Sequence, residues 1–380
     1  MDGSREAAGS TRGEGLYRLV EEYAALGDHR TGSEVDAATI AWFAAELARR
    51  GARVERRPFG FDRYVADWSV AVDGIAVTAC PLFYEAVGTA RSRAPFVAAA
   101  AVLARDRTAA SLEQALDRAR EAGATLAVIA TENPAGYLQV PNRAPLPGEG
   151  PPTLLVAGAL AERLRRGAVT ASLEARVEPG QSENVEGHFG DTEAAPIVIA
   201  TPLSGWFRCA GERGTGIAIA LEVAERLAGR YPVLVVGTSG HELLPHLGLA
   251  TYLAGGPPPA RCVVHLGANL ATGEPGPDGS LALGPARLVS ARVDREGLEE
   301  LVASLQPTRA EVQLDPPEWR GEARLWAAAG DYALLSFVGA AAVFHTPEDV
   351  PSVATSPELL EKVADAVEAA VECVAVRSGH

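Results

Sequence analysis

The sequence of 380 residues lacks the usual marks of a secreted or membrane-spanning protein. Its four cysteines are far apart and form no CxxC pair, so neither a disulfide framework nor a zinc knuckle is indicated. No apolar run is long enough to cross a bilayer, and the first 14 residues are polar, without a hydrophobic signal region. We therefore expect a cytoplasmic protein with free thiols, no membrane partner and a flexible leader at residues 1–14.

Positive charge is also scarce. Lys and Arg total 34 against 49 Asp and Glu, which gives a formal net charge of −15. Because phosphate binding needs a basic face, this balance argues against nucleic acid as a partner. Apolar residues are plentiful: hydrophobic residues make up 47% of the chain and charged residues 22%. These proportions are typical of a globular chain that buries a core in two or three domains.

Patterns of apolar residues divide the chain into three parts, which we place at residues 15–80, 81–180 and 181–380. In the first two parts, the spacing predicts helices at 16–26, 37–50, 111–121 and 160–166. Alternating or short apolar runs predict strands at 52–59, 68–72, 75–78, 96–103, 126–130, 153–156 and 169–175. Asp73-Gly74 is a hairpin signal, and residues 134–152 form a loop rich in Pro and Gly.

The third part alternates strands and helices, as a mainly parallel α/β sheet does. Strands are predicted at 197–201, 233–238, 263–266 and 341–344, and helices at 215–227, 295–304 and 357–374. In open α/β sheets the chemistry lies beyond the carboxyl ends of the strands. Polar side chains follow all four predicted strands: Ser204, Trp206, Arg208, Glu212 and Arg213, then His241, Glu242 and His246, then His265 and Asn269, and lastly His345. Four such loops together indicate a site at one rim of the sheet.

These loops resemble the co-catalytic zinc aminopeptidase family, of the aminopeptidase Y and glutamate carboxypeptidase II type, and the likeness runs over nearly the whole chain. The segments that carry it are 27–33, 122–124, 152–156, 182–187, 330–332 and 345–349. The resemblance implies a mainly parallel, mixed sheet flanked by helices. It also implies a protease-associated-like domain inserted at 81–180, between two parts of a peptidase-like domain.

The resemblance also implies a metal chemistry, which the sequence only partly retains. The family holds two zinc ions with His, a bridging Asp, Glu, Asp and His, and uses a further Glu as general base. Here the five ligand positions read Thr201, Glu212, Glu242, Gly267 and His345, and the base position reads His241. Three protein ligands and an open position suffice for catalytic zinc. The implied cofactor is therefore at most one Zn²⁺, held by Glu212, Glu242 and His345, and a metal-free state is left open.

His241 is the sharpest departure from the family pattern. An imidazole titrates near neutral pH, so His241 is a candidate base or a fourth metal ligand. Arg208, Arg213 and Asn269 offer hydrogen-bond donors to a substrate carboxylate or an oxyanion. Ser204 with His241 or His246 is a candidate nucleophile pair. Two further candidates for substrate binding are Trp206, as a pocket wall, and Tyr332, from the closing segment.

Several of these residues also have purely structural interpretations. Glu242 could pair with Arg208 or Arg213, and Glu212-Arg213 could be a salt-bridged turn before a helix. His265 could be a hydrogen-bonded buried imidazole.

Three functions therefore remain open. The first is a hydrolase that cleaves an amide or peptide-type bond in a small or short peptide-like substrate, using at most one metal ion with His241 as base. The second is a catalytically inactive, peptidase-fold binding protein. The third is a metal-free enzyme that uses His241 with Arg208 or Arg213. The two enzymes are favoured because polar groups on four converging loops are costly to bury without a use. A homodimer is left open.

Overall fold

The computed structural model describes residues 11–104, 107–190, 194–284 and 287–377. Its main element is a ten-stranded mixed sheet in the order β17-β16-β18-β13-β11-β12-β10-β1-β2, with β4 paired to β10. The parallel centre consists of β11 (Ile197–Pro202), β12 (Val233–Thr238), β13 (Cys262–Leu266) and β18 (Ala333–Gly339). β16 (Arg287–Arg292) runs antiparallel to β18, and β17 (Glu311–Leu314) runs parallel to β16.

Helices cover both faces of this sheet, which explains why its central strands are apolar throughout. On β11, Ile197 and Ile199 belong to one core cluster, whereas Val198 and Ala200 belong to the other. The first face is covered by α1 (Arg12–Ala25), α2 (Glu34–Arg49), α5 (Thr215–Leu227), α7 (Arg295–Leu305) and α10 (Pro357–Arg377). The second face is covered by α6 (Leu247–Ala254) and α8 (Ala323–Ala329).

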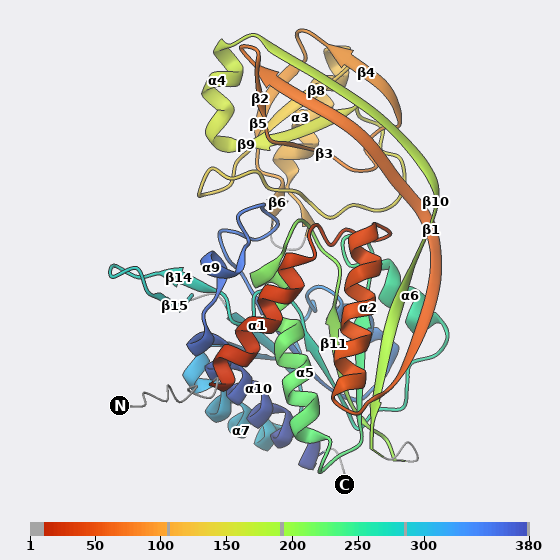
Figure 1. Cartoon of the computed structure of the whole chain (residues 1–380), viewed down its shortest axis with the longest axis vertical. Helices are drawn as coiled ribbons and strands as arrows, with labels where there is room; N and C mark the ends of the chain where they lie inside the picture. Colours follow the sequence, from red (N-terminus) through yellow and green to blue (C-terminus); the bar gives the residue numbers. More distant parts are fainter. Residues whose placement is uncertain (1–10, 105–106, 191–193, 285–286, 378–380) are drawn as a thin grey trace, which may run out of the picture.

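Two long strands connect the main sheet to a second unit (Figure 1). β1 (Arg53–Val72) and β10 (Val169–Phe189) pair antiparallel along their whole length, from Arg53 opposite His188 to Val72 opposite Val169. β2 (Ile75–Val77) and β4 (Gly88–Ser92) extend this ribbon at its far end. The sequence predicted separate strands at 52–59 and 68–72. The stretch between them is only partly buried and shows little alternation of apolar residues, and pairing with β10 makes the whole one strand.

The second unit has a four-stranded sheet and a core of its own. Its strands are β3 (Ala79–Pro81), β9 (Thr153–Ala157), β8 (Ala127–Thr131) and β5 (Phe96–Ala100), and its helices are α3 (Ala110–Glu121) and α4 (Ala161–Arg166), the latter after a 3-10 turn η1 (Gly158–Leu160). This is the region in which the inserted domain was predicted. β10 passes position 180 without a break, so the boundary predicted there falls inside a strand.

The remaining elements are short. They are the hairpins β6 (Leu103–Ala104) with β7 (Arg107–Thr108) and β14 (Gly273–Pro275) with β15 (Leu281–Leu283), the π-helical turn η2 (Ala210–Gly214), the 3-10 turn η3 (Gln306–Thr308) and α9 (Pro351–Ala354). The hairpin of β14 and β15 projects from the side of the molecule (Figure 1). Among the described residues, none of the helices combines the length and the apolar character needed to span a membrane.

Two sequence predictions are corrected here. The flexible leader was placed at residues 1–14, of which 1–10 lie outside the described residues. Residues 12–14 are helical, because Thr11 and Glu14 form a reciprocal capping box at the start of α1. The strand predicted at 341–344 is also wrong: the last strand of the sheet is β18, which ends at Gly339, and residues 342–345 form a turn. The apolar run 340–343 finds no strand partner, since it leaves the sheet beside the cavity described below.

Candidate functional site

A cavity of about 460 Å³ lies at the carboxyl ends of the central strands, where the second unit faces the sheet. From the sheet side it is lined by Arg213, His241, His246, His265, Gly267, Ala268, Arg320, Gly321, Val338, Gly339, Ala340, Phe344 and His345. From the second unit it is lined by Leu103, Glu132, Pro134, Gln139 and Asn142. The cavity therefore lies at the rim that the order of strands and polar loops predicts, and its size suits a small molecule.

Four histidines line this cavity, and each has its Nδ1 atom engaged. The contacts are His241 with Glu322 Oε1 at 3.1 Å, His246 with the His241 carbonyl at 2.8 Å, His265 with Ser336 Oγ at 2.9 Å, and His345 with the Val140 carbonyl at 2.7 Å. A carbonyl only accepts hydrogen bonds, so Nδ1 of His246 and of His345 carries the proton. Nε2 of His246 is then an acceptor that can meet a ligand or a metal ion, whereas Nε2 of His345 faces the Glu212 carboxylate at 3.1 Å.

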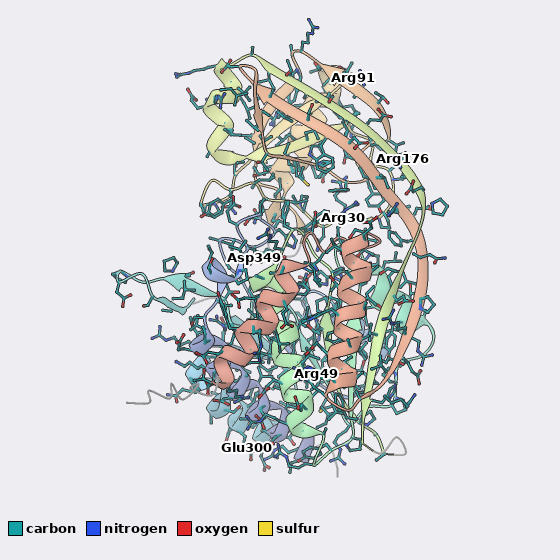
Figure 2. The ribbon with its side chains drawn as sticks, in the orientation of Figure 1. Arg30, Arg49, Arg91, Arg176, Glu300 and Asp349 are labelled. Carbon is teal, nitrogen blue, oxygen red and sulfur yellow. The ribbon has the colours of Figure 1, made fainter. Side chains whose placement is uncertain are left out.

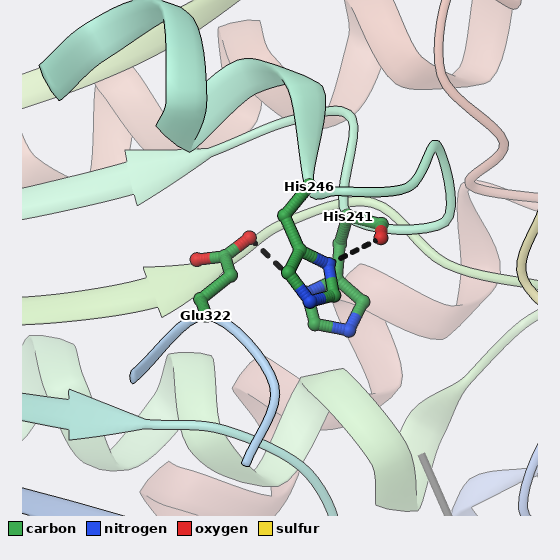
Figure 3. Close-up of side chains that lie close together, drawn as sticks. All are labelled: His241, His246 and Glu322. Carbon is green, nitrogen blue, oxygen red and sulfur yellow. Dashed lines mark hydrogen bonds and ion pairs between the residues drawn. The ribbon is translucent and has the colours of Figure 1, made fainter. Parts of the chain in front are cut away.

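His241, His246 and Glu322 form a close cluster at the site (Figure 3). One potential ligand atom from each lies within 4.8 Å of the others, and the two imidazoles stack with their centroids 4.4 Å apart. Glu322 lies just before α8 and also accepts from Thr238 Oγ1 at 2.8 Å. Burial raises the pKa of Glu322 to about 7. Burial, and then the charge of Arg213, hold the pKa of His241 well below its usual value, so the ring is neutral near pH 7.

A second buried group joins Glu212, Arg213 and His345. The chain leaves β11 and forms η2, whose Gly211 and Glu212 amides donate to the Asp349 carboxylate at 2.7 and 2.9 Å. Oε1 of Glu212 lies 2.6 Å from Arg213 Nη2 and 3.1 Å from His345 Nε2. Burial alone would raise the pKa of Glu212, but Arg213 and His345 lower it below its usual value. Glu212 is therefore an ionised carboxylate whose counter-charge is a guanidinium.

Glu242 belongs to neither group. Its carboxylate accepts the Thr31 amide at 2.5 Å and the Ser204 hydroxyl at 2.8 Å. Within the described residues, the groups of potential ligands that lie within 4.8 Å of one another do not include Glu212, Glu242 and His345 together. The three-ligand set expected from the sequence is thus not assembled in the structure.

The residues do not fit a pair of metal ions. Thr201 donates its hydroxyl to the Leu266 carbonyl, and Gly267 offers no ligand atom. A Cβ at Gly267 would lie 2.8 Å from Cε1 of His265, so an imidazole fills the space that a carboxylate would need there. The buried guanidinium of Arg213 adds a fixed positive charge beside Glu212. A single ion has a better-matched set in His241, His246 and Glu322. The other close group, Glu55, Glu186 and His188, lies on the β1–β10 ribbon, where both acids pair with Arg57.

The other residues proposed from the sequence are placed as follows. Ser204 donates to Glu242 and accepts the backbone amide of His241. Trp206 donates to Asn142 Oδ1 and packs on Phe83. Arg208 is exposed, Asn269 donates to the Gly339 carbonyl, and Tyr332 donates to the Trp326 carbonyl. Of the six residues proposed for substrate binding, Arg213 alone lines the cavity. His265 combines its two interpretations, because it is buried, hydrogen-bonded and also part of the cavity wall.

Sequence reasoning missed Arg320 and Glu322. Neither follows a strand: both lie in the turn before α8, and an acid just before a short apolar helix is usually interpreted as a residue that stabilises the helix N-terminus. The backbone geometry of two cavity residues also indicates a functional site, and it is visible only in the structure. His246 and His345 have φ angles of 69° and 60°, which non-glycine residues adopt at a cost that concentrates at functional sites.

No family model matches this chain, and no curated protein matches it. Solved structures do. A peptidase M28 precursor from Shewanella amazonensis has a TM-score of 0.73 and 18% identity, over 96% of this chain and 93% of that one. BSAP, a zinc aminopeptidase from Bacillus subtilis, has a TM-score of 0.68 and 16% identity over 95% of each chain. An aminopeptidase from Aneurinibacillus sp. strain AM-1 has a TM-score of 0.61 and 17% identity, over 94% of this chain and 93% of that one. The chain therefore has the mixed α/β fold of these peptidase structures, as the resemblance implied.

Proposed function

We propose that this chain, built on the fold of zinc aminopeptidases, is a hydrolase that cleaves an amide-type bond in a small substrate, with His241 as general base and without a bridging pair of metal ions. The observation that carries the proposal is the contact between His241 Nδ1 and Glu322 Oε1, at 3.1 Å, in a residue that lines the cavity. A carboxylate at Nδ1 keeps the proton on that nitrogen and leaves Nε2 as the acceptor.

The proposed reaction uses water as the nucleophile. His241 Nε2 takes a proton from the water, whose oxygen then forms a bond to the carbonyl carbon of the amide. The carbon–nitrogen bond breaks, and His241 returns the proton to the departing amine, so that an amide and water become a carboxylic acid and an amine. Negative charge that develops on the carbonyl oxygen is stabilised by the buried guanidinium of Arg213, which lines the same cavity.

A second candidate is a hydrolase with one metal ion at His241, His246 and Glu322. The close approach of their ligand atoms favours it, and the neighbouring structures named above include a zinc aminopeptidase. A zinc ion bound there would supply a water molecule of lowered pKa. Arg213 counts against this candidate, because its charge already acts on His241 and would repel a divalent cation.

The test is hydrolysis of a panel of acyl-amino-acid amides, followed by mass spectrometry and with the metal content measured on the same sample. We expect the wild type to cleave at least one amide and His241→Gln to have lost this cleavage. His188→Gln, on the β10 ribbon outside the cavity, is the matched control and should keep the wild-type rate. Cleavage that is lost in proportion to zinc removal would favour the second candidate, and full activity of His241→Gln would exclude both.

A further inference from the structure

Guanidinium groups line the cavity, although the chain as a whole is acidic. The protein carries a formal charge of −15, yet among the described residues the cavity wall contains two arginines, Arg213 and Arg320, and one acid, Glu132. Glu132 is exposed, whereas Arg213 is fully buried. An anion that enters the cavity therefore meets guanidinium groups, although the outside of the protein repels anions on average.

Arg213 and Arg320 are in different electrostatic situations. The guanidinium of Arg213 is already neutralised in part by Glu212, with Nη2 2.6 Å from that carboxylate. Arg320 is half-buried and lies two residues before Glu322, and its guanidinium has neither an ion pair nor a hydrogen bond within the described residues. A half-buried arginine without a partner retains its full capacity for a planar, two-bonded contact with a carboxylate.

Arg320 is also placed close to the proposed base. Its neighbour Gly321 has a left-handed φ of 54°, and a Cβ built there would lie 3.8 Å from Cε1 of both His241 and His265. The turn that contains Arg320 therefore packs against the imidazole of His241. An anion held by Arg320 would fix the rest of the molecule within reach of His241.

The rest of the cavity wall is suited to an apolar group. Six of its residues have apolar side chains: Leu103, Pro134, Ala268, Val338, Ala340 and Phe344. These come from both the sheet side and the second unit, so an apolar group that enters the cavity is covered from two directions.

We propose that Arg320 is the recognition residue for a carboxylate group of the ligand, so that the cavity selects small molecules that carry a carboxylate together with an apolar group. As a statement about the substrate, the inference rests on the proposed function: the substrate is then an amide that bears a carboxylate. As a statement about binding, the inference depends only on the cavity and on Arg320.

The experiment measures the binding of three matched compounds that contain no amide bond: 4-phenylbutanoate, 4-phenylbutan-1-ol and 4-phenylbutylamine. Isothermal titration calorimetry at pH 7.5 is carried out on the full chain. We expect the dissociation constant of the carboxylate to be at least ten-fold lower than that of the alcohol, and the amine to bind most weakly. Arg320→Gln should remove this preference while leaving alcohol binding within two-fold.

The control for charge is Arg91→Gln. Arg91 is exposed on β4, at the outer end of the part that contains the second sheet (Figure 2), and its loss should leave the preference intact. Equal binding of the three compounds, no binding of any, or a preference that persists in Arg320→Gln would each overturn the inference. Because the assay needs no turnover, a chain that binds the carboxylate but cleaves no amide contradicts the proposed function and leaves the inference standing.

Discussion

Nη2 of Arg213 lies 2.6 Å from Oε1 of Glu212, and both side chains are almost completely shielded from solvent. In the sequence resemblance, Glu212 stands where the family has the carboxylate that bridges its two metal ions. Here the next residue in the sequence supplies the positive charge. This pair is the clearest structural reason why the residues do not fit a bridged pair of metal ions.

Removal of the guanidinium should destabilise the protein strongly. Arg213→Met leaves Glu212 as a buried, unpaired charge, and we expect the free energy of unfolding to fall by about 3–5 kcal/mol. The double variant Glu212→Gln/Arg213→Met removes both charges, so its free energy of unfolding should fall less than that of Arg213→Met alone. Urea unfolding of the three proteins measures this. Equal losses in the single and double variants would show that the pair is not the source of the effect.

The reaction rate should depend on the protonation state of Glu322. Its pKa is raised to about 7 by burial, and only the ionised form holds Nδ1–H of His241 firmly. The rate of the wild type should therefore rise from pH 6 to pH 8 with a midpoint near 7. Glu322→Gln should lower the rate by about 10²-fold or more and abolish the rise in rate between pH 6 and pH 8. Glu274→Gln, an exposed acid on β14, is the control and should keep both the rate and the profile.

Buried neutral histidines should make part of the stability sensitive to acid. Burial lowers the pKa of His265 to about 3. In mildly acidic solution this imidazole is therefore protonated in the unfolded chain but stays neutral in the folded chain. The contribution of His265 to the free energy of unfolding is therefore largest above pH 6.5 and declines as the pH falls toward 3. The destabilisation caused by His265→Gln should be about 1 kcal/mol smaller at pH 5.5 than at pH 7.5. Chemical unfolding at the two pH values measures it, and a pH-independent difference would contradict the assignment.

Gly267 should tolerate no side chain. A Cβ there would lie 2.8 Å from His265 Cε1 and 3.0 Å from the Phe337 carbonyl, so Gly267→Ala should cost about 1–3 kcal/mol of stability. Gly229→Ala, where a Cβ would meet nothing within 4 Å, is the matched control and should be neutral or slightly stabilising. Because the imidazole of His265 fills the space beside Gly267, Gly267→Asp should not create tight zinc binding. Calorimetry with zinc chloride would measure this. Zinc binding in that variant would mean that the space is open after all.

The sequence predicts the layered α/β architecture well because its strongest signals are local. The helix at 215–227 and the strand at 233–238 are confirmed with their predicted bounds, since unbroken apolar runs and clear periodicity define them. The 20-residue strand β1 was predicted in pieces, because its pairing with β10 is a long-range contact that leaves no clear periodic pattern in a partly exposed ribbon.

The site is predicted in location but less well in its contacts. The order of strands places His241 and Arg213 at one rim, and both line the cavity. His345 lines it too, although the strand predicted before it does not form. The partners of each side chain depend on loops that are distant in the sequence. Glu242 turns toward Thr31, and the partner of His241 is Glu322, which comes from a turn before a helix rather than from a strand end. No spacing in the sequence connects these residues.

The most direct test of the account is amide hydrolysis by chelator-treated protein whose zinc content has been measured. We expect the wild type to keep its rate with less than about one zinc ion per ten chains, and the rate of His241→Gln to be lower by about 10²–10⁴-fold under the same conditions. A wild-type rate that disappears on chelation and returns with one equivalent of zinc would contradict it.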